Sequence, residues 1–171
     1  ISYKSNSDGS SSPYELNINY LDAITGGEAS PPLLRKYMGS QLILLSLQGV
    51  PGVYYHSLLG SHNDTAGMKA SGINRRINRE KLTLRQIAER FSTSPFQRDI
   101  YREYIRFLEC RRQYSAFSPS AGQTLLRLDP RVFSIMRENH ETGERIAVLV
   151  NISGDALAVD LGAVGSGILD Q

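Results

Sequence analysis

The residue best placed to do chemistry is an arginine on the apolar face of an expected helix. Residues 95–114 have helical periodicity, and Arg111 follows Tyr104 and Leu108 at spacings that place all three on the inward stripe. Burying a guanidinium there is costly unless hydrogen-bond acceptors meet it. Arg111 is therefore a member of a buried ion pair, a helix-end side chain that extends to solvent, or a group that binds a ligand.

A second group of polar side chains follows the stretch GVPGVYYHSLLGS, residues 49–61. Gly and Pro introduce a short apolar run, VPGVYYHSLL at 50–59, that predicts a buried strand, and a long polar loop over 60–82 comes after it. His62, Asn63 and Asp64 begin this loop, where they either contact a polar substrate or form a simple turn. The histidines lack the spacing of a metal site, and we expect neither a metal nor a cofactor.

A basic run, GINRRINREK, lies further along the same loop. Its cations, Arg75, Arg76, Arg79 and Lys81, suggest a site for phosphate or nucleic acid, but no aromatic residues alternate with them and Glu80 interrupts them. The whole chain carries a net charge of only +2, which disfavours a nucleic-acid partner. We interpret the run as a solvated or salt-bridged loop face.

Composition narrows the class of protein further. With 171 residues, 40% of them hydrophobic and 21% charged, the chain can form an ordinary folded core. Its one cysteine, Cys110, excludes an internal disulfide and favours a reducing compartment, so we expect the cytoplasm. The longest apolar run, LILLSL at 42–47, is too short to cross a bilayer.

The elements that must position these side chains change character along the chain. Residues 1–13 predict a loop, 31–48 a helix that Gly49 stops, and 83–91 a short helix before the one at 95–114. The helix at 31–48 has one apolar face, formed by Leu33, Leu34, Tyr37, Met38, Gln41, Leu42 and Leu45. After residue 118 the period becomes two, which predicts an antiparallel meander of four strands within 124–128, 131–139, 144–153 and 156–162.

This pattern gives an α/β part over 1–117 and an all-β part over 118–171. The first residue is Ile1, and the last stretch, GSGILDQ, has the pattern of a new strand. We therefore expect a fragment of a longer chain.

Several segments together resemble glycoside hydrolase family 13, the α-amylase clan. GVPGVYYHSLLGS is similar to the eighth barrel strand of that clan, and the resemblance places this strand at about 50–56. SPYELNINYLDAI, SHNDTAG, GINRRINREKL and CRRQYSAF resemble its sucrose phosphorylase and glucosylglycerate phosphorylase-like branch. The resemblance implies the C-terminal part of a (β/α)8 barrel followed by a truncated antiparallel β-domain.

The resemblance also implies an activity and a set of roles. Such an enzyme cleaves an α-glucoside (sucrose, sucrose 6′-phosphate or glucosylglycerate) with inorganic phosphate by retaining double displacement, giving α-glucose 1-phosphate. Its catalytic carboxylates would lie upstream of Ile1, so the fragment alone should be inactive and should need the upstream barrel or self-association. Arg111 would pair with an upstream Asp and bind the glucose 4-hydroxyl, and Asp64, with Asn63 and His62 beside it, would line the acceptor side.

Two other functions stay open on the sequence. One is an α-glucosidase or amylase-type hydrolase of the same clan. The other is a non-catalytic carbohydrate-binding or interaction module, although Phe133 is the only aromatic residue after Phe117. In every case we expect a small sugar as partner, and no nucleic acid or membrane.

Overall fold

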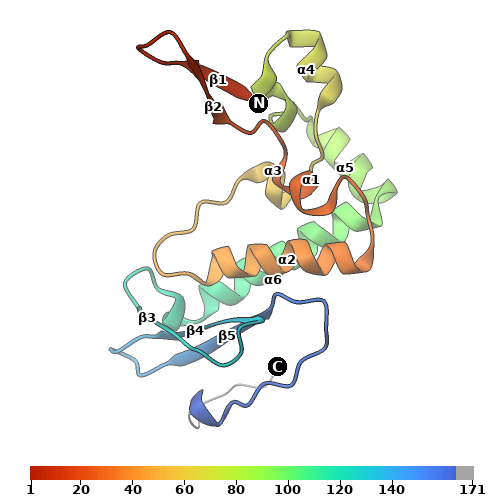
Figure 1. Ribbon diagram of the computed structural model, residues 1–171. Coiled ribbons are helices and arrows are strands. Elements are labelled where there is room, and N and C mark those ends of the chain that lie inside the picture. The colour runs from red at the N-terminus through yellow and green to blue at the C-terminus, as the bar shows by residue number, and fades with distance from the viewer. Residues whose placement is uncertain (165–171) are drawn as a thin grey trace. The chain divides into compact units, whose positions relative to one another are not determined.

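The computed structural model describes residues 1–164, which form two compact units (Figure 1). Unit 1 contains residues 1–34 and 53–101, and unit 2 contains residues 35–52 and the described chain from 102 onward. Helices and a small antiparallel sheet make up each unit, which is consistent with an α/β class, while the expected barrel stays a prediction. The domain boundary predicted near residue 118 would separate a barrel from a β-domain. It stays a prediction.

Unit 1 is mostly helical. Its elements are the hairpin of β1 (Ser2–Ser5) and β2 (Ser11–Glu15), the helices α1 (Tyr20–Thr25), α3 (Tyr55–Leu58), α4 (Thr65–Ser71) and α5 (Leu84–Thr93), a 3₁₀ helix (Asn74–Asn78), and the start of α6 (Pro95–Gln113). The predicted helices at 83–91 and 95–114 are thus confirmed. Thr83 begins α5 with a capping box, since its Oγ1 accepts from the Gln86 N–H and the Gln86 amide oxygen accepts from the Thr83 N–H.

Three predictions within residues 1–82 were wrong. Residues 1–13 contain the β1–β2 hairpin rather than a loop alone, and residues 60–82 contain α4 and the 3₁₀ helix. Residues 50–56 form no strand in the described chain: they are irregular to Tyr54 and then enter α3, and Val50 is 81% exposed. A strand needs a neighbour to take its main-chain hydrogen bonds, and a parallel neighbour is not among residues 1–164.

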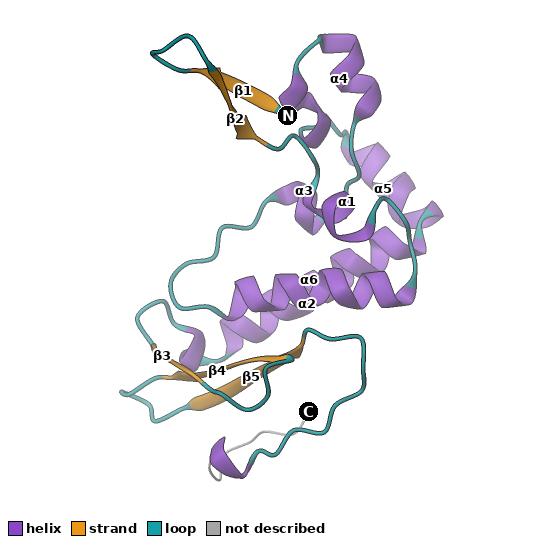
Figure 2. Ribbon diagram, in the orientation of Figure 1, coloured by secondary structure: helices purple, strands orange, loops and turns teal. Residues whose placement is uncertain are grey.

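Unit 2 combines helical and antiparallel parts. α2 (Pro31–Ser46) enters it at Arg35, α6 contributes its later turns, a 3₁₀ helix spans Ser115–Phe117, and the sheet has the order β3 (Gly122–Leu125), β4 (Val132–Glu138), β5 (Arg145–Asn151) (Figure 2). All its neighbours are antiparallel, so the predicted strands at 131–139 and 144–153 are confirmed, whereas the first strand, predicted at 124–128, lies earlier, at Gly122–Leu125. Gly143 closes the β4–β5 turn with φ +74°, a conformation that favours glycine.

The fourth strand predicted at 156–162 is not formed. These residues are irregular up to a 3₁₀ helix at Gly162–Val164, because in the described chain no further strand pairs with them. The strand pattern noted at 165–171 lies outside the described residues.

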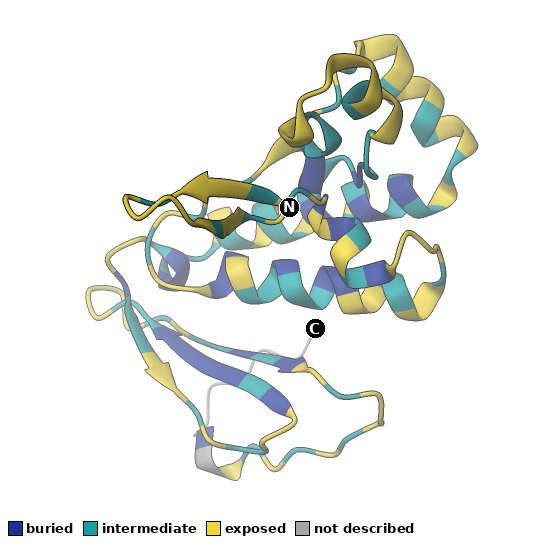
Figure 3. Cartoon of the chain, turned by 45° about the horizontal axis from the view of Figure 1, so that its top comes forward, coloured by how far each residue is buried: buried dark blue, intermediate teal, exposed yellow. Residues whose placement is uncertain are grey.

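The core of unit 2 joins the sheet to α2. Phe117, Ile135, Val148 and Val150 are buried together, and β4 is buried along most of its length (Figure 3). On α2 the expected apolar face is confirmed, since Tyr37, Met38, Gln41 and Leu45 are buried. α2 ends at Ser46, two residues before the predicted end, and Gly49 follows with φ +98°.

Candidate functional site

Asp64 anchors the polar loop that follows α3. Its Oδ1 accepts a 2.8 Å hydrogen bond from the N–H of Gly67, so Asp64 caps the N-terminus of α4. Its Oδ2 lies 3.5 Å from Nη2 of Arg76, and its own N–H donates to the carbonyl of Ile77 at 2.7 Å. The carboxylate is thereby fixed between α4 and the 3₁₀ helix, with 13% of the side chain exposed.

Glycine at position 67 makes this arrangement possible. A Cβ atom built at Gly67 would lie 2.1 Å from Oδ2 of Asp64, far inside van der Waals contact. Any side chain there would displace the carboxylate. The motif SHNDTAG therefore encodes the position of Asp64 as well as its identity.

His62 and Asn63 are held by α1 of the same unit. Oδ1 of Asp22 lies 2.5 Å from Nδ1 of His62, and Oδ2 of Asp22 accepts the N–H of Asn63 at 2.7 Å. The side-chain oxygen of Asn63 in turn accepts the N–H of Asn19 at 2.6 Å. The loop is thus tied to α1 through both of its residues before Asp64.

His62, Asn63 and Asp64 line one pocket, and their contact with a substrate stays a prediction. The pocket has a volume of about 370 Å³, and Glu80, Arg90 and Gln97 contribute to its lining. Arg90 forms an ion pair with Glu80, and Gln97 donates to the carbonyl of Gly60 at 2.7 Å. The pocket therefore offers an imidazole, amides and charges of both signs, which suits a polyhydroxylated or anionic small molecule.

Two tyrosines fix the segment that carries the basic run. The Tyr54 hydroxyl donates to the carbonyl of Asn78 at 2.5 Å, and the Tyr55 hydroxyl donates to that of Glu80 at 3.2 Å. In the run itself, Arg75 pairs with Glu15 at 2.7 Å and Arg76 with Asp64, so the interpretation as a salt-bridged loop face is confirmed for these two arginines.

Arg111 belongs to unit 2, whereas the other three predicted site residues belong to unit 1. Its guanidinium donates to main-chain carbonyls at the end of α2: those of Leu45, Leu47 at 3.3 Å and Gly49 at 2.6 Å. Burial lowers the pKa of Arg111. Within residues 1–164 its acceptors are thus carbonyls rather than a carboxylate, and its contact with a sugar stays a prediction.

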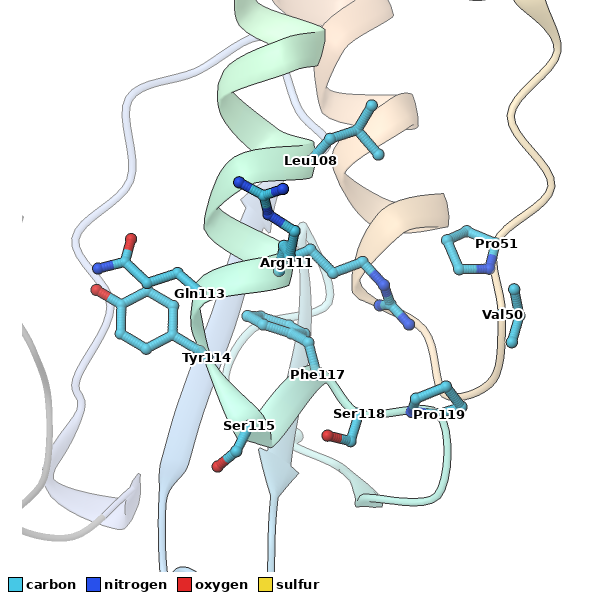
Figure 4. Close-up of a pocket in the computed structure, with 11 residues that line it drawn as sticks. Val50, Pro51, Leu108, Arg111, Gln113, Tyr114, Ser115, Phe117, Ser118 and Pro119 are labelled. Carbon is cyan, nitrogen blue, oxygen red and sulfur yellow. The ribbon is translucent and has the colours of Figure 1, made fainter.

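Arg111 also lines a second pocket, of about 500 Å³. Figure 4 shows Arg111, Phe117 and Pro51 among its walls, and the guanidinium carbon lies 5.8 Å from the centre of the Phe117 ring. The contact is a cation–π interaction within one unit. Arg111 therefore has a packing role that helical spacing alone did not reveal.

Sequence reasoning missed two residues that hold these sites. Arg137 is fully buried on β4, where strand alternation places it on the face of Ile135, and this signal was available. Asp22 precedes His62 by 40 residues on a short helix, and no local pattern joins them. Among residues 1–164, no three His, Cys, Asp or Glu side chains gather as a metal site requires, and no helix is long and apolar enough to span a membrane.

Comparisons with known proteins support the resemblance. No family model matches the chain. It is 41% identical over 155 residues to the glucosylglycerate phosphorylase of Spirochaeta thermophila, and 34% identical over 163 residues to that of Escherichia coli. These alignments cover 90% and 94% of the chain but 26% and 29% of the relatives, so the chain spans little more than a quarter of their length.

A solved structure supports the fold. The crystal structure of sucrose 6F-phosphate phosphorylase from Thermoanaerobacter thermosaccharolyticum matches with a TM-score of 0.62 and 21% identity, over 86% of this chain and 27% of that one. At this identity the match concerns the fold alone. Over nine-tenths of its length, the chain is a homologue of the glucosylglycerate and sucrose phosphorylase branch of glycoside hydrolase family 13.

Proposed function

We propose that the chain is part of a glucosyl-transferring phosphorylase and supplies the acceptor side of its active site. The protein would cleave an α-glucoside with inorganic phosphate and release α-glucose 1-phosphate. The observation that carries the proposal is the 41% identity to a glucosylglycerate phosphorylase over 90% of the chain. For this reason glucosylglycerate is the substrate we expect, ahead of sucrose and sucrose 6′-phosphate.

The proposal includes the family barrel. In it, α2 would be the seventh helix, and residues 50–56, which form no strand among residues 1–164, would lie beside barrel strands from the rest of the protein. The exposure of Val50, Tyr54 and Tyr55, at 81%, 43% and 50%, supports this, since a completed sheet would cover such side chains. The chain therefore needs the remaining barrel, or self-association, to bury this segment.

The catalytic carboxylates are proposed to lie in that remaining part. Retaining transfer needs a carboxylate nucleophile and a second carboxyl group that acts first as acid and then as base. Asp64 suits neither role, because its two oxygens already serve the α4 cap and Arg76. With Asn63 and His62 beside it, Asp64 is proposed to line the acceptor side, where the acceptor leaves and phosphate enters, and Arg111 remains the proposed glucose ligand.

The test uses the protein that carries this chain. Glucosylglycerate, sucrose and sucrose 6′-phosphate are each supplied with and without inorganic phosphate, and glucose 1-phosphate and free glucose are measured. The proposal expects phosphate-dependent glucose 1-phosphate, with the highest kcat/KM for glucosylglycerate. Release of free glucose at the same rate without phosphate would instead identify a hydrolase of the clan.

Matched variants test the assignment of the pocket. Asp64→Asn keeps an oxygen that can cap α4 but removes the charge that pairs with Arg76, and we expect KM for the acceptor to rise with a small change in folding. Asp155→Asn, at an exposed position in unit 2, is the control and should leave KM unchanged. The 171-residue chain alone should be inactive, and sustained turnover by it would contradict the placement of the catalytic carboxylates.

A further inference from the structure

We propose that Asp22 is a positioning residue for the pocket: its carboxylate sets the orientation and the tautomer of His62. The role of the pocket in binding rests on the proposed function, but the geometry of this contact does not. Asp22 comes from α1, is separated from His62 by 40 residues, and does not itself line the pocket.

The contact is a two-donor clamp. Each oxygen of Asp22 serves a different donor on consecutive residues, with Oδ1 2.5 Å from Nδ1 of His62 and Oδ2 2.7 Å from the N–H of Asn63. The Asp22 side chain is 9% exposed and that of His62 is 39% exposed. The carboxylate is thus largely enclosed, whereas the imidazole it holds still reaches the pocket.

The chemistry of the clamp decides which ring nitrogen carries the proton. An ionised carboxylate can only accept hydrogen bonds, so Nδ1 of His62 must be the donor. In the neutral imidazole the proton is then on Nδ1, which leaves Nε2 as an acceptor. An acceptor at the wall of the pocket suits a hydroxyl donor, such as one on a sugar or a glycerate.

Asn19 makes the clamp more rigid. Its N–H donates to the side-chain oxygen of Asn63 at 2.6 Å. Asn19 and Asp22 together therefore hold three groups of the loop: the His62 ring, the Asn63 N–H and the Asn63 side-chain oxygen. Asn19 is itself 97% buried, with 3% exposed. Since Asp64 follows Asn63 directly, the clamp also limits where the Asp64 backbone can lie.

The isosteric variant Asp22→Asn gives a sharp test. An amide has one acceptor oxygen and one donor nitrogen, so if the oxygen keeps the Asn63 N–H, the NH2 group must donate to Nδ1 of His62. The proton of the neutral ring then moves to Nε2. The variant thus inverts the tautomer while it preserves the shape of the contact.

The experiment measures this tautomer by ¹⁵N NMR of the imidazole in the protein that carries this chain, with His62→Gln to assign the signals. We expect the Nδ1–H form in the wild type and the Nε2–H form in Asp22→Asn. Glu28→Gln, an exposed carboxylate in unit 1, is the matched control and should leave the tautomer unchanged. An Nε2–H form in the wild type overturns the proposal even if the variant fails to fold.

Activity provides the second measurement. If His62 contacts the substrate, Asp22→Asn should lower kcat/KM by about tenfold to a hundredfold through misplacement of the pocket wall, whereas Glu28→Gln should not. A wild type with the Nδ1–H form but without phosphorylase activity would overturn the proposed function and leave the clamp standing. A folded Asp22→Asn variant with the wild-type tautomer would overturn the clamp, whatever the activity.

Discussion

Arg111 and Arg137 direct their guanidinium groups at the same helix end, with no carboxylate among their described partners. Arg111 donates to the carbonyl of Gly49 at 2.6 Å, Arg137 donates to that of Ser46 at 2.9 Å, and both lie within 6 Å of the Phe117 ring centre, at 5.8 and 5.9 Å. The last carbonyls of α2 lack helical partners and carry the negative end of the helix dipole. The α2 carbonyls of Leu45 and Ser46 therefore accept from Arg111 and Arg137, and the carbonyls of Leu47 and Gly49 just beyond the helix accept from Arg111 as well.

The two arginines also influence each other. Burial lowers the pKa of Arg137, and the positive charge of Arg111 lowers it further. Hydrogen bonds offset the cost of burying this charge. The Arg137 guanidinium donates to main-chain carbonyls in three separate segments, at Ser46, at Ser118, and at the neighbours Ala121 and Gly122. This set of bonds ties the sheet of unit 2 to the end of α2.

Arg137→Met should therefore be strongly destabilising. The substitution keeps apolar volume but removes the guanidinium that donates to the buried carbonyls of Ser46 and Ala121, at about 1–3 kcal/mol for each group that stays unsatisfied. We expect the free energy of unfolding in urea to fall by at least about 3 kcal/mol. Arg145→Met, at the exposed first position of β5, is the control and should change it by less than about 0.5 kcal/mol. An equal loss of unfolding free energy in the two variants would show that Arg137 does not hold the sheet to the end of α2.

Gly67 and Asp64 should show a reversal of sign in a double-mutant cycle. In the wild type, Gly67→Ala forces its Cβ against the Asp64 carboxylate and breaks the α4 cap, so it should destabilise by about 1 kcal/mol. In an Asp64→Ala background the clash is gone, and the same change should stabilise α4 by about 0.5–1 kcal/mol. Urea unfolding of the four proteins measures both values.

The control for this cycle is Gly154→Ala, where a Cβ would meet nothing within 4 Å. Its effect should be the same with and without Asp64. A destabilising Gly67→Ala in both backgrounds would show that the Gly67–Asp64 contact is not the cause.

Local pattern predicted the parts of the fold that local contacts determine. The stripes of α2 and α6, the short helix α5, and strands β4 and β5 were all predicted from patterns over fewer than twenty residues. The strand predicted at 50–56 failed because a strand depends on partners that sequence pattern does not locate. The stretch at 156–162 failed for the same reason.

The candidate site also has residues that are neighbours in the sequence and residues that only the fold brings near. His62, Asn63 and Asp64 are adjacent in sequence and lie together in the structure. Asp22 and Arg76, which hold them, come from separate elements 40 residues before His62 and 12 residues after Asp64, and only the fold brings them near. For Arg111, spacing predicted the inward direction, but the carbonyl partners depend on where α2 ends.

His56 should make the stability of unit 1 dependent on pH. The side chain is fully buried, its Nδ1 lies 2.9 Å from the Ser61 hydroxyl oxygen, and its Nε2 has no hydrogen-bond partner among residues 1–164. Burial lowers the pKa of His56, while the charge of Glu80 opposes the shift. The folded state therefore favours the neutral ring.

The sign follows from proton binding. At a pH below the ordinary histidine pKa of about 6.5, His56 binds a proton in the unfolded chain, whereas the buried ring in the folded chain stays neutral. The free energy of unfolding should therefore reach its plateau above that pH. It should decrease as the pH drops from 7.5 to 5.5, by at most about 1.4 kcal/mol per pH unit. Urea unfolding at several pH values measures the slope, and His56→Gln should flatten it. His140→Gln, whose ring is 76% exposed, should keep the wild-type slope; superimposable profiles for the wild type and His56→Gln would exclude His56 as the titrating group.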